Sequence, residues 1–494
     1  MNVKTSKACD GCRLRKVKCN GQQPCQQCSH LNLSCNFSAP KNRRQIVRGS
    51  RLALLKSPQA TSPSLLPASK SIAHHEHSDA FFYSLLGDYE SVVYPVNPVI
   101  TRTEMEDVIR GMSQDINDTA LVYAYAAVTI NLSKTSPEGA HGPVVAEIEA
   151  LTVKSLAARS RADAAGYGPR EAMSVSVRRI VTCIFLEICL MAFKRYDRAF
   201  LLLREAIALI QMLDVDDRKA PGDDKTVAEI ARRQRLYWEA FIHERFLTIM
   251  TSYPSIMPPL RSGLPATDPT IPASVNIGFT RIIKLFLIMD DEFLQHWIAQ
   301  REEKEEAKPS MTVKWIEHKQ QQLDDDEYDA KKDENTGLTE LQLADLFITR
   351  LWLRTLVWQL AMSRCLLSSA PPSSAHEGMS IAFPARRLST QLRSLVDSVK
   401  SQTSITVHGT GIVQKLFEVT NTIADVITVM SNPSLDAEGN QRVKDLVFLV
   451  ERLLSFERVD KVQRNILRTK MEALVKKFPG LGMPDLIYSP ESTT

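Results

Sequence analysis

Residues 9–35 read CDGCRLRKVKCNGQQPCQQCSHLNLSC, and this stretch decides the fold of the N-terminal part of the chain. It holds six of the nine cysteines, in the spacing C-x2-C-x6-C-x5-C-x2-C-x6-C. The half-unit C-x2-C-x6-C occurs twice, joined by five residues that include Gly21 and Pro24. This repetition indicates that the six side chains act as one set. They are Cys9, Cys12, Cys19, Cys25, Cys28 and Cys35.

These cysteines are best explained as metal ligands. A disulfide framework is typical of secreted chains, but the first residues, MNVKTSK, lack the apolar segment of a secretory signal. A redox dithiol of the thioredoxin type needs a strand before it in a βαβ unit, and neither C-x2-C pair has one. An all-thiolate set suits zinc, with an iron–sulfur cluster as the minor alternative.

The number of metal ions follows from the repeat. Six thiolates do not divide into two complete tetrahedral sets, so either one zinc ion uses four of them or two zinc ions share two bridging thiolates. The duplicated half-unit favours two Zn²⁺ ions, and symmetry makes Cys9 and Cys25 the bridges. Because so small a segment has almost no apolar core, we expect metal binding to supply most of its folding free energy.

Positive charge is concentrated at the same end of the chain. Residues 1–56 carry twelve Lys and Arg and one acid, a charge of +11, whereas the whole chain of 494 residues carries only +4. Within the cysteine segment, residues 13–18 (RLRKVK) hold four cations, and the matching residues 29–34 (SHLNLS) hold none. A basic head on a mildly acidic body indicates a polyanionic partner, either nucleic acid or a membrane surface.

Residues 13–18 are expected to form a short helix with Asp10 as its N-cap. Its two apolar residues lie three positions apart and would share the face toward the metal. Arg15 and Lys16 would then project outward, and such a helix fits the major groove, where Arg and Lys donate hydrogen bonds to guanine. A solvated basic face or a nuclear-import patch is the alternative. The flanking cations are Arg13 and Lys18.

The run KACDGCRLRKVKC at residues 7–19, with the three later cysteines, resembles the fungal binuclear zinc-cluster (Zn2Cys6) transcription regulators. All six cysteines match that pattern, and so does the core C-R-x-R-K-x-K-C. The resemblance implies two zinc ions bridged by the first and fourth cysteines. It also implies that Arg15 and Lys16 read base edges, often of a CGG triplet, while Arg13 and Lys18 hold phosphates. It covers less than a tenth of the chain.

Residues 41–78 are expected to be a linker, basic at first and then rich in Ser and Pro. A coiled coil that pairs two chains needs about three or four heptads, but Leu52 and Leu55 make barely one before Pro58. The sequence therefore leaves monomer and homodimer both open. Three histidines near the end of the linker lack an organised ligand set, and we expect them to be solvated: His74, His75 and His77.

From residue 79 onward, apolar residues follow the i, i+3, i+4 spacing of helices. We therefore expect a mostly α protein, with residues 1–40 as the zinc segment and residues 79–494 as a large all-α regulatory body. A chain of 494 residues predicts two to four domains. The clearest expected helices are 175–193, 196–213, 232–253, 338–367, 443–456 and 461–478.

Two details of the body can also be predicted. Residues of about 302–336 are dense in charge and include DDDE at 324–327, which favours a solvated loop over an acidic activation segment. The three remaining cysteines lie in apolar helical stretches and are expected to be buried small hydrophobic residues. They are Cys183, Cys189 and Cys365.

Parts of the body resemble the fungal-specific regulatory, or middle homology, domain. The matching stretches are RAFLLLREAIALIQML at 198–213, RRQRLYWEAFIHERF at 232–246 and LRSGLP at 260–265. The resemblance covers roughly residues 80–365. It implies a helical domain that controls activity, in some members by binding a small metabolite. From the sequence, Glu244 and Arg245 are expected to be helix-surface or inter-helix ion-pair groups.

No motif of an enzyme accompanies these features. The body has no Walker loop, no G-x-S-x-G and no H-E-x-x-H. No apolar run reaches the ~18–20 residues of a membrane span, and we expect a soluble, intracellular protein.

The sequence thus predicts a nuclear, sequence-specific DNA-binding regulator rather than an enzyme. Its partners would be double-stranded DNA with CGG-type sites and, in addition, a second copy of the chain or a small-molecule inducer. From the resemblance we expect it to be an activator of RNA polymerase II genes in a fungal metabolic pathway. The alternative is a zinc-dependent protein-interaction module on a helical scaffold, although such modules need His ligands or wider Cys spacings.

Overall fold

The structure is a computed structural model in which the chain divides into two units, Met1–His75 and Glu76–Thr494. In the first unit it describes Cys19, Gly21, Gln22 and Cys25. In the second unit it describes residues 77–134, 142–166, 175–213, 215, 227–300, 311–332, 337–398, 409–429, 437–456 and 458–477.

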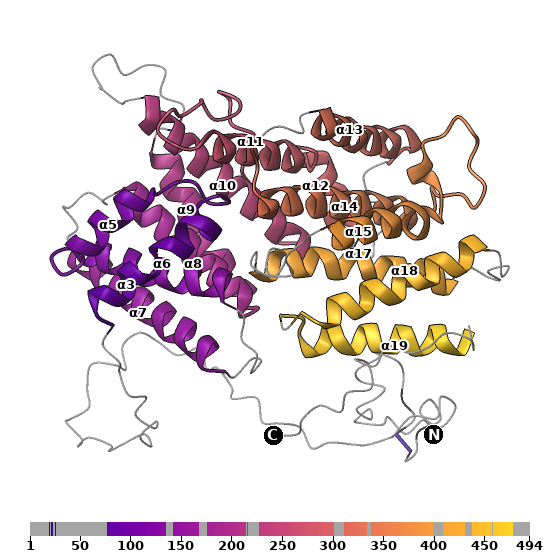
Figure 1. Ribbon diagram of the computed structural model, residues 1–494, viewed down its shortest axis with the longest axis horizontal. Helices are drawn as coiled ribbons and strands as arrows, with labels where there is room; N and C mark the ends of the chain where they lie inside the picture. Colours follow the sequence, from indigo (N-terminus) through magenta and orange to yellow (C-terminus); the bar gives the residue numbers. More distant parts are fainter. Residues whose placement is uncertain are drawn as a thin grey trace, which may run out of the picture. The chain divides into compact units, whose positions relative to one another are not determined.

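The described part of the second unit is helical and contains no strand, only an isolated bridge between Ser368 and Ser380 (Figure 1). This confirms the predicted mostly α fold class. In chain order the helices are α3 (Asp79–Ser84), α4 (Leu86–Asp88), the π-helix η1 (Tyr89–Val93), α5 (Arg102–Gly111), α6 (Ile116–Ser133), α7 (Pro143–Gly166), α8 (Val177–Ala192), α9 (Tyr196–Met212), α10 (Val227–Thr251), α11 (Ala273–Leu287), α12 (Asp291–Ala299), α13 (Val313–Lys332), α14 (Glu340–Ser363), the 3-10 helix η4 (Glu377–Met379), the π-helix η5 (Pro384–Leu388), α15 (Ser389–Ser398), α17 (Gly409–Val429), α18 (Ala437–Leu454) and α19 (Lys461–Lys477).

Helix α6 is the centre of the first group of helices. Its sequence is apolar on every side, so it must be covered on every side, and α5, α7, α8 and η1 pack around it. Asp115 caps its first turn by accepting a hydrogen bond from the N–H of Asn117 at 2.7 Å. The buried Tyr125 donates its hydroxyl to the carbonyl oxygen of Phe82 at 3.1 Å, which ties α3 to α6.

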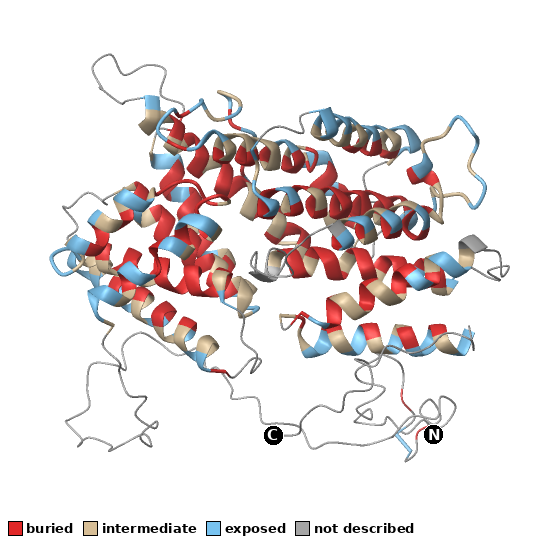
Figure 2. Ribbon diagram, viewed as in Figure 1, coloured by how far each residue is buried: buried red, intermediate tan, exposed pale blue. Residues whose placement is uncertain are grey.

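Helix α14 has the same role among the later helices. It begins at a capping box in which the side chains of Thr339 and Gln342 each bond the other's backbone N–H. It is buried along most of its length (Figure 2), with Trp352 and Trp358 both in the core. Helices α11, α13 and α17 pack against it, and α18 and α19 in turn pack on α17.

The helices expected from apolar spacing are present, with ends that differ by a few residues. The expected helix 175–193 is α8, and 461–478 is α19. Helix α10 begins at Val227, five residues before its expected start. The sequence pattern therefore identified these elements correctly and located their ends less well, as is usual where end residues carry little apolar signal.

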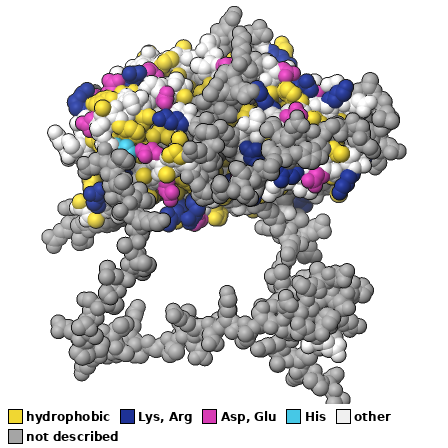
Figure 3. All heavy atoms as spheres, turned by 60° about the horizontal axis from the view of Figure 1, so that its bottom comes forward, with side chains coloured by type: hydrophobic (Ala, Val, Ile, Leu, Met, Phe, Trp, Pro, Cys, Tyr) yellow, Lys and Arg dark blue, Asp and Glu magenta, His cyan; other side chains and the backbone are white. Residues whose placement is uncertain are grey.

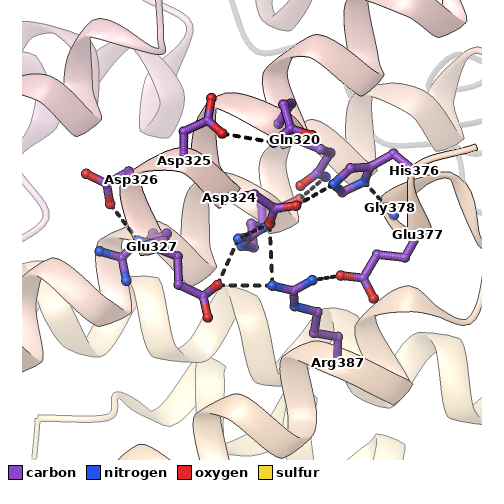
Figure 4. A network of polar contacts seen from close by, with 12 residues as sticks. Gln320, Asp324, Asp325, Asp326, Glu327, His376, Glu377, Gly378 and Arg387 are labelled. Atoms are coloured by element: carbon purple, nitrogen blue, oxygen red, sulfur yellow. Dashed lines mark hydrogen bonds and ion pairs between the residues drawn. The ribbon is translucent and has the colours of Figure 1, made fainter. Parts of the chain in front are cut away.

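The charged segment differs from expectation, because residues 313–332 form helix α13 rather than a loop. The physical reason is that its acidic residues have buried basic partners (Figure 4). Asp324 and Glu327 both accept hydrogen bonds from the guanidinium of Arg354, at 2.5 and 3.0 Å, and the side chain of Arg354 is fully buried. Arg387 of η5 contacts the same two carboxylates, at 3.4 and 3.1 Å.

Cys365 also differs from expectation, since it is exposed and not part of the core. Helix α14 ends two residues before it, and Cys365 has a φ of 55°, in the left-handed region where a helix cannot continue. In the described part of the chain, no helix combines the length and apolarity that crossing a membrane requires.

Candidate functional site

The cysteine-rich segment is represented by four described residues, and they include the third and fourth cysteines. Cys25 is fully buried and Cys19 is 9% exposed. The backbone N–H of Gly21 donates a hydrogen bond to Sγ of Cys19 at 3.4 Å. An N–H group directed at a cysteine sulfur stabilises the negative charge that the sulfur carries as a metal ligand.

Gly21 also sets the direction of the chain after this contact. Its φ of 77° lies in the left-handed region that glycine adopts without steric cost. The amide of Gly21 lies against the sulfur two residues earlier, and its positive φ turns the following chain toward Cys25. Buried cysteine sulfurs with an N–H donor fit zinc, a borderline-soft ion that binds thiolates. This segment has almost no apolar core to stabilise it. When bound, zinc would cross-link the cysteines and stabilise the segment instead.

The other predicted residues of the segment lie outside the described residues, so their positions remain predictions. The four metal ligands among them are Cys9, Cys12, Cys28 and Cys35. The four DNA-contacting residues are Arg13, Arg15, Lys16 and Lys18. The linker histidines His74 and His75 also lie outside the described residues.

Within the described residues, no group of three or more His, Cys, Asp or Glu side chains could hold a metal ion. His77, one of the three linker histidines, packs against Phe81 and forms an ion pair with Glu147 instead of being solvated. Cys183 and Cys189 are buried as expected, and burial raises the pKa of each thiol to about 12. Both thiols therefore stay protonated and inert at neutral pH.

Glu244 and Arg245 of α10 turn out to be buried structural groups. Glu244 accepts hydrogen bonds from Arg204 at 2.7 Å and from the backbone N–H groups of Ile256 and Met257, both at 2.9 Å. Arg245 donates to the carbonyl oxygens of Met257 and Met289. Burial lowers the pKa of Arg245 to about 10. The two side chains thus hold the segment after α10 against the helix.

The helical body also contains a cavity of about 220 Å³. Side chains of α8, α10, α11, α14 and α17 line it, together with the turn after η1. His243 and Glu187 are among the lining residues, and Nδ1 of His243 lies 2.7 Å from Oε2 of Glu187. A cavity lined by several helices, with a few polar groups on mostly apolar walls, has the character of a small-molecule site.

The acid–base groups at this cavity are strongly coupled. Burial by itself lowers the pKa of His243, but the charge and hydrogen bond of Glu187 outweigh it and hold that pKa above its usual value. Burial raises the pKa of the neighbouring Glu239 to about 8. Glu239 is therefore mostly protonated at neutral pH, and the contact with Glu187 favours the charged form of His243.

Sequence reasoning did not find this cavity. Its polar residues come from positions as far apart as Asn97 and Gln463, and none of them, taken alone, marks a binding site. The resemblance at 232–246 includes His243, but no spacing in that stretch marks it as different from its neighbours. Only the packing of the helices brings these residues together.

Known proteins resemble this chain both in its cysteine-rich segment and over most of its length. Residues 7–44 match the fungal Zn(2)-Cys(6) binuclear cluster domain. The chain is 22% identical over 480 residues to the Probable sucrose utilization protein SUC1 of Candida albicans, covering 94% of this chain and 88% of the other. It is 21% identical over 444 residues to the Maltose fermentation regulatory protein MAL33 of Saccharomyces cerevisiae, covering 85% and 84%.

A shorter match has a higher identity. Over 43 residues the chain is 49% identical to the Transcription factor PDR1 of Saccharomyces cerevisiae, which is 9% of this chain and 4% of that protein. Its relatives are transcription regulators, not enzymes. The chain therefore carries a fungal zinc-binding Zn(2)-Cys(6) cluster domain ahead of a large helical body, and over most of its length it is similar to fungal transcription regulators.

Proposed function

We propose that this protein is a nuclear, sequence-specific DNA-binding regulator that activates RNA polymerase II genes of a fungal metabolic gene set. The observation that carries the proposal is the doubled C-x2-C-x6-C pattern, with four cations between its second and third cysteines and none in the matching stretch. A structural zinc site alone does not need that one-sided charge, whereas a helix that enters a DNA groove does.

The cluster domain would occupy residues 1–40, with two Zn²⁺ ions bridged by Cys9 and Cys25. Arg15 and Lys16 would read base edges of a CGG-type site. Arg13 and Lys18 would hold phosphates on either side. The buried position of Cys25 and the N–H donor at Cys19 support the cysteines as metal ligands.

Residues 41–78 would be the linker and residues 79–494 the regulatory body. Outside residues 1–56 the chain carries 49 Lys and Arg against 56 Asp and Glu. On the face drawn in Figure 3, basic and acidic side chains of the described body are interspersed. This distribution supports the basic head as the part that binds DNA. A second copy of the chain and a small-molecule inducer are the further partners that we propose.

The relatives suggest which genes are regulated. Two of them are described as a sucrose utilization protein and a maltose fermentation regulatory protein, and each aligns over more than four fifths of this chain. Genes for the use of a carbohydrate are therefore the metabolic set that we propose as the target.

The test is a DNA-binding titration of the full-length, zinc-loaded protein. The affinity for a duplex with a CGG site should exceed that for a scrambled duplex by at least ~10³-fold. If Arg13 and Lys18 each neutralise one phosphate, the logarithm of the binding constant should fall with the logarithm of salt concentration with a slope of about −1.8 or steeper. Native mass spectrometry should find two zinc ions per chain.

Three results would count against the proposal. Equal affinity for the two duplexes would exclude sequence-specific binding. Affinity for a protein partner with little salt dependence, and none for DNA, would instead support the alternative of a zinc-dependent protein-interaction module. One zinc ion per chain would exclude the bridging arrangement of Cys9 and Cys25.

A further inference from the structure

The cavity of about 220 Å³ in the helical body has mostly apolar walls. Phe246 of α10 and Phe279, Ile282 and Phe286 of α11 contribute to one side, and Met191 of α8 contributes to another. Such walls favour a ligand whose surface is mainly apolar, because its burial removes that surface from water at a gain of roughly 25 cal/mol per Å².

The ionic groups in the wall already have partners within the protein. Arg458 donates hydrogen bonds to the carbonyl oxygens of Asn131 and Lys134. Each lining carboxylate has a basic side chain within hydrogen-bonding or ion-pair distance. A charged ligand would have to break one of these pairs or remain unpaired in a largely apolar space, and both are costly. The cavity therefore selects a neutral ligand. The pairs are Glu187 with His243, Asp345 with Lys415, and Asp460 with Lys194.

Asn97, a lining residue, carries a buried oxygen without a hydrogen-bond partner in the described part of the chain. Oδ1 of Asn97 is buried and has no hydrogen-bond donor among the described residues, and the residue is only 5% exposed. A buried acceptor without a donor is unfavourable in a folded protein. A ligand that donates a hydrogen bond to this oxygen removes that penalty.

The turn that carries Asn97 is held in place by hydrogen bonds to its backbone. The N–H of Asn97 donates to the carbonyl oxygen of Val93 at 2.9 Å. Arg235, itself buried and paired with Asp268 at 3.0 Å, donates to the carbonyl oxygen of Pro98 at 2.7 Å. The acceptor is therefore in place before a ligand arrives.

We propose that this cavity binds a neutral, mainly apolar small molecule that carries a hydroxyl or N–H donor for Oδ1 of Asn97. The inference deepens the proposed function, on which it rests for the consequence of binding, since such a molecule would be the inducer of the regulator. A disaccharide is a poorer occupant, because its many hydroxyl groups would meet apolar walls and only one open acceptor.

The test uses equilibrium dialysis of the full-length, zinc-loaded protein with three related probes. 2-Naphthol is neutral at pH 7 and has one donor, 2-methoxynaphthalene lacks the donor, and 2-naphthoate is charged. We expect one 2-naphthol per chain, with 2-methoxynaphthalene bound about fivefold more weakly and 2-naphthoate at least about tenfold more weakly. Sucrose and maltose are included as hydroxyl-rich probes and should bind more weakly than 2-naphthol.

Two variants locate the site. Asn97→Leu should lower the affinity for 2-naphthol to the level of the affinity for 2-methoxynaphthalene, and it should leave the affinity for 2-methoxynaphthalene unchanged. General damage to the fold would lower both affinities. This variant removes an oxygen that has no donor, so the fold should tolerate it. Met250→Trp should fill the cavity and weaken the binding of both 2-naphthol and 2-methoxynaphthalene. Met362→Trp is its matched control, because Met362 is exposed on α14 and does not line the cavity.

The proposal is overturned if 2-naphthoate binds as tightly as 2-naphthol, or if Asn97→Leu and Met250→Trp both bind 2-naphthol as the unchanged protein does. It is also overturned if sucrose or maltose binds this site more tightly than 2-naphthol. The same samples are assayed for CGG-site DNA. If DNA binding fails while 2-naphthol binds, the proposed function fails and the cavity assignment stands.

Discussion

A single glycine illustrates how the cysteine segment depends on one backbone conformation. Gly21 has a φ of 77°, a value that costs a residue with a Cβ ~1–2 kcal/mol, and this φ directs the chain from the contact with Sγ of Cys19 toward Cys25. We predict that Gly21→Val lowers the affinity for zinc by about tenfold, because a β-branched residue disfavours this turn. Competition with a chromogenic zinc chelator measures the change.

The matched variant is Gly21→Asn. Asparagine has a side chain of similar bulk but adopts positive φ several times more readily than other non-glycine residues. Its zinc affinity should stay within about threefold of that of the unchanged protein. Equal zinc affinities of the Val and Asn variants would show that the left-handed turn is not required.

Two cations in the same segment are predicted to have different roles. Arg15→Ala should reduce the preference for a CGG duplex over a scrambled one by ~1–3 kcal/mol, because a base contact is lost. Lys18→Ala should weaken binding to both duplexes equally, because a phosphate contact is lost. It should also reduce the slope of the logarithm of the binding constant against the logarithm of salt concentration by about 1. Fluorescence anisotropy over a range of salt concentrations measures both effects. An Arg15→Ala protein with full preference would show that this residue does not face the bases.

At the scale of elements, α13 shows how a charged stretch becomes part of the core. Asp324 and Glu327, three residues apart, lie on one side of the helix and contact Arg354 of α14 and Arg387 of η5 (Figure 4). His376 adds a hydrogen bond to Asp324 at 2.8 Å. The network therefore anchors α13 to three other elements through charge-assisted hydrogen bonds.

This network gives the body a defined dependence on pH. Partial burial would raise the pKa of Glu327, but the hydrogen bond of Lys331 and the charges of Arg354 and Arg387 lower it to about 2 from its ordinary 4.5. Between these pH values the unfolded chain binds a proton that the folded chain does not. The stabilisation is therefore complete above about pH 4.5 and is lost as the pH falls through about 2.

We predict that Glu327→Gln lowers the free energy of unfolding at neutral pH by ~2–3 kcal/mol and flattens its decline between about pH 5 and pH 2. Urea unfolding at a series of pH values measures this. Asp325→Asn is the control on the same helix, since Asp325 is exposed and should change the stability by less than ~0.5 kcal/mol. Parallel pH profiles for Glu327→Gln and the unchanged protein would contradict the prediction.

At the scale of the whole molecule, we expect the two units to be stabilised by different forces. The helical body buries a large apolar core, and its described residues contain no group of ligands for a metal ion. We predict that a strong chelator abolishes specific DNA binding and leaves the helical far-ultraviolet circular dichroism nearly unchanged, because the body does not depend on zinc. Added zinc should restore DNA binding. Loss of the helical signal on chelation would contradict this division.

The sequence by itself determined the fold class and the nature of the zinc segment. The ligands of the segment lie within 27 residues, so their spacing in the chain largely dictates their spacing in space. Helical periodicity is equally local, and it identified α8 and α9 because each carries its own apolar face. The roles of Arg15 and Lys16 remain predictions, because their residues lie outside the described part of the chain.

Only the tertiary structure decided the rest. Asp324 and Glu327 of α13 and Arg354 of α14 read as surface charges in the sequence, and only the packing of the helices pairs them. Cys365 reads as a core residue, but α14 ends before it and leaves it exposed. The cavity is assembled from side chains that are hundreds of residues apart. No local pattern reports such an arrangement, because it depends on how helices cross one another and not on the periodicity within any of them.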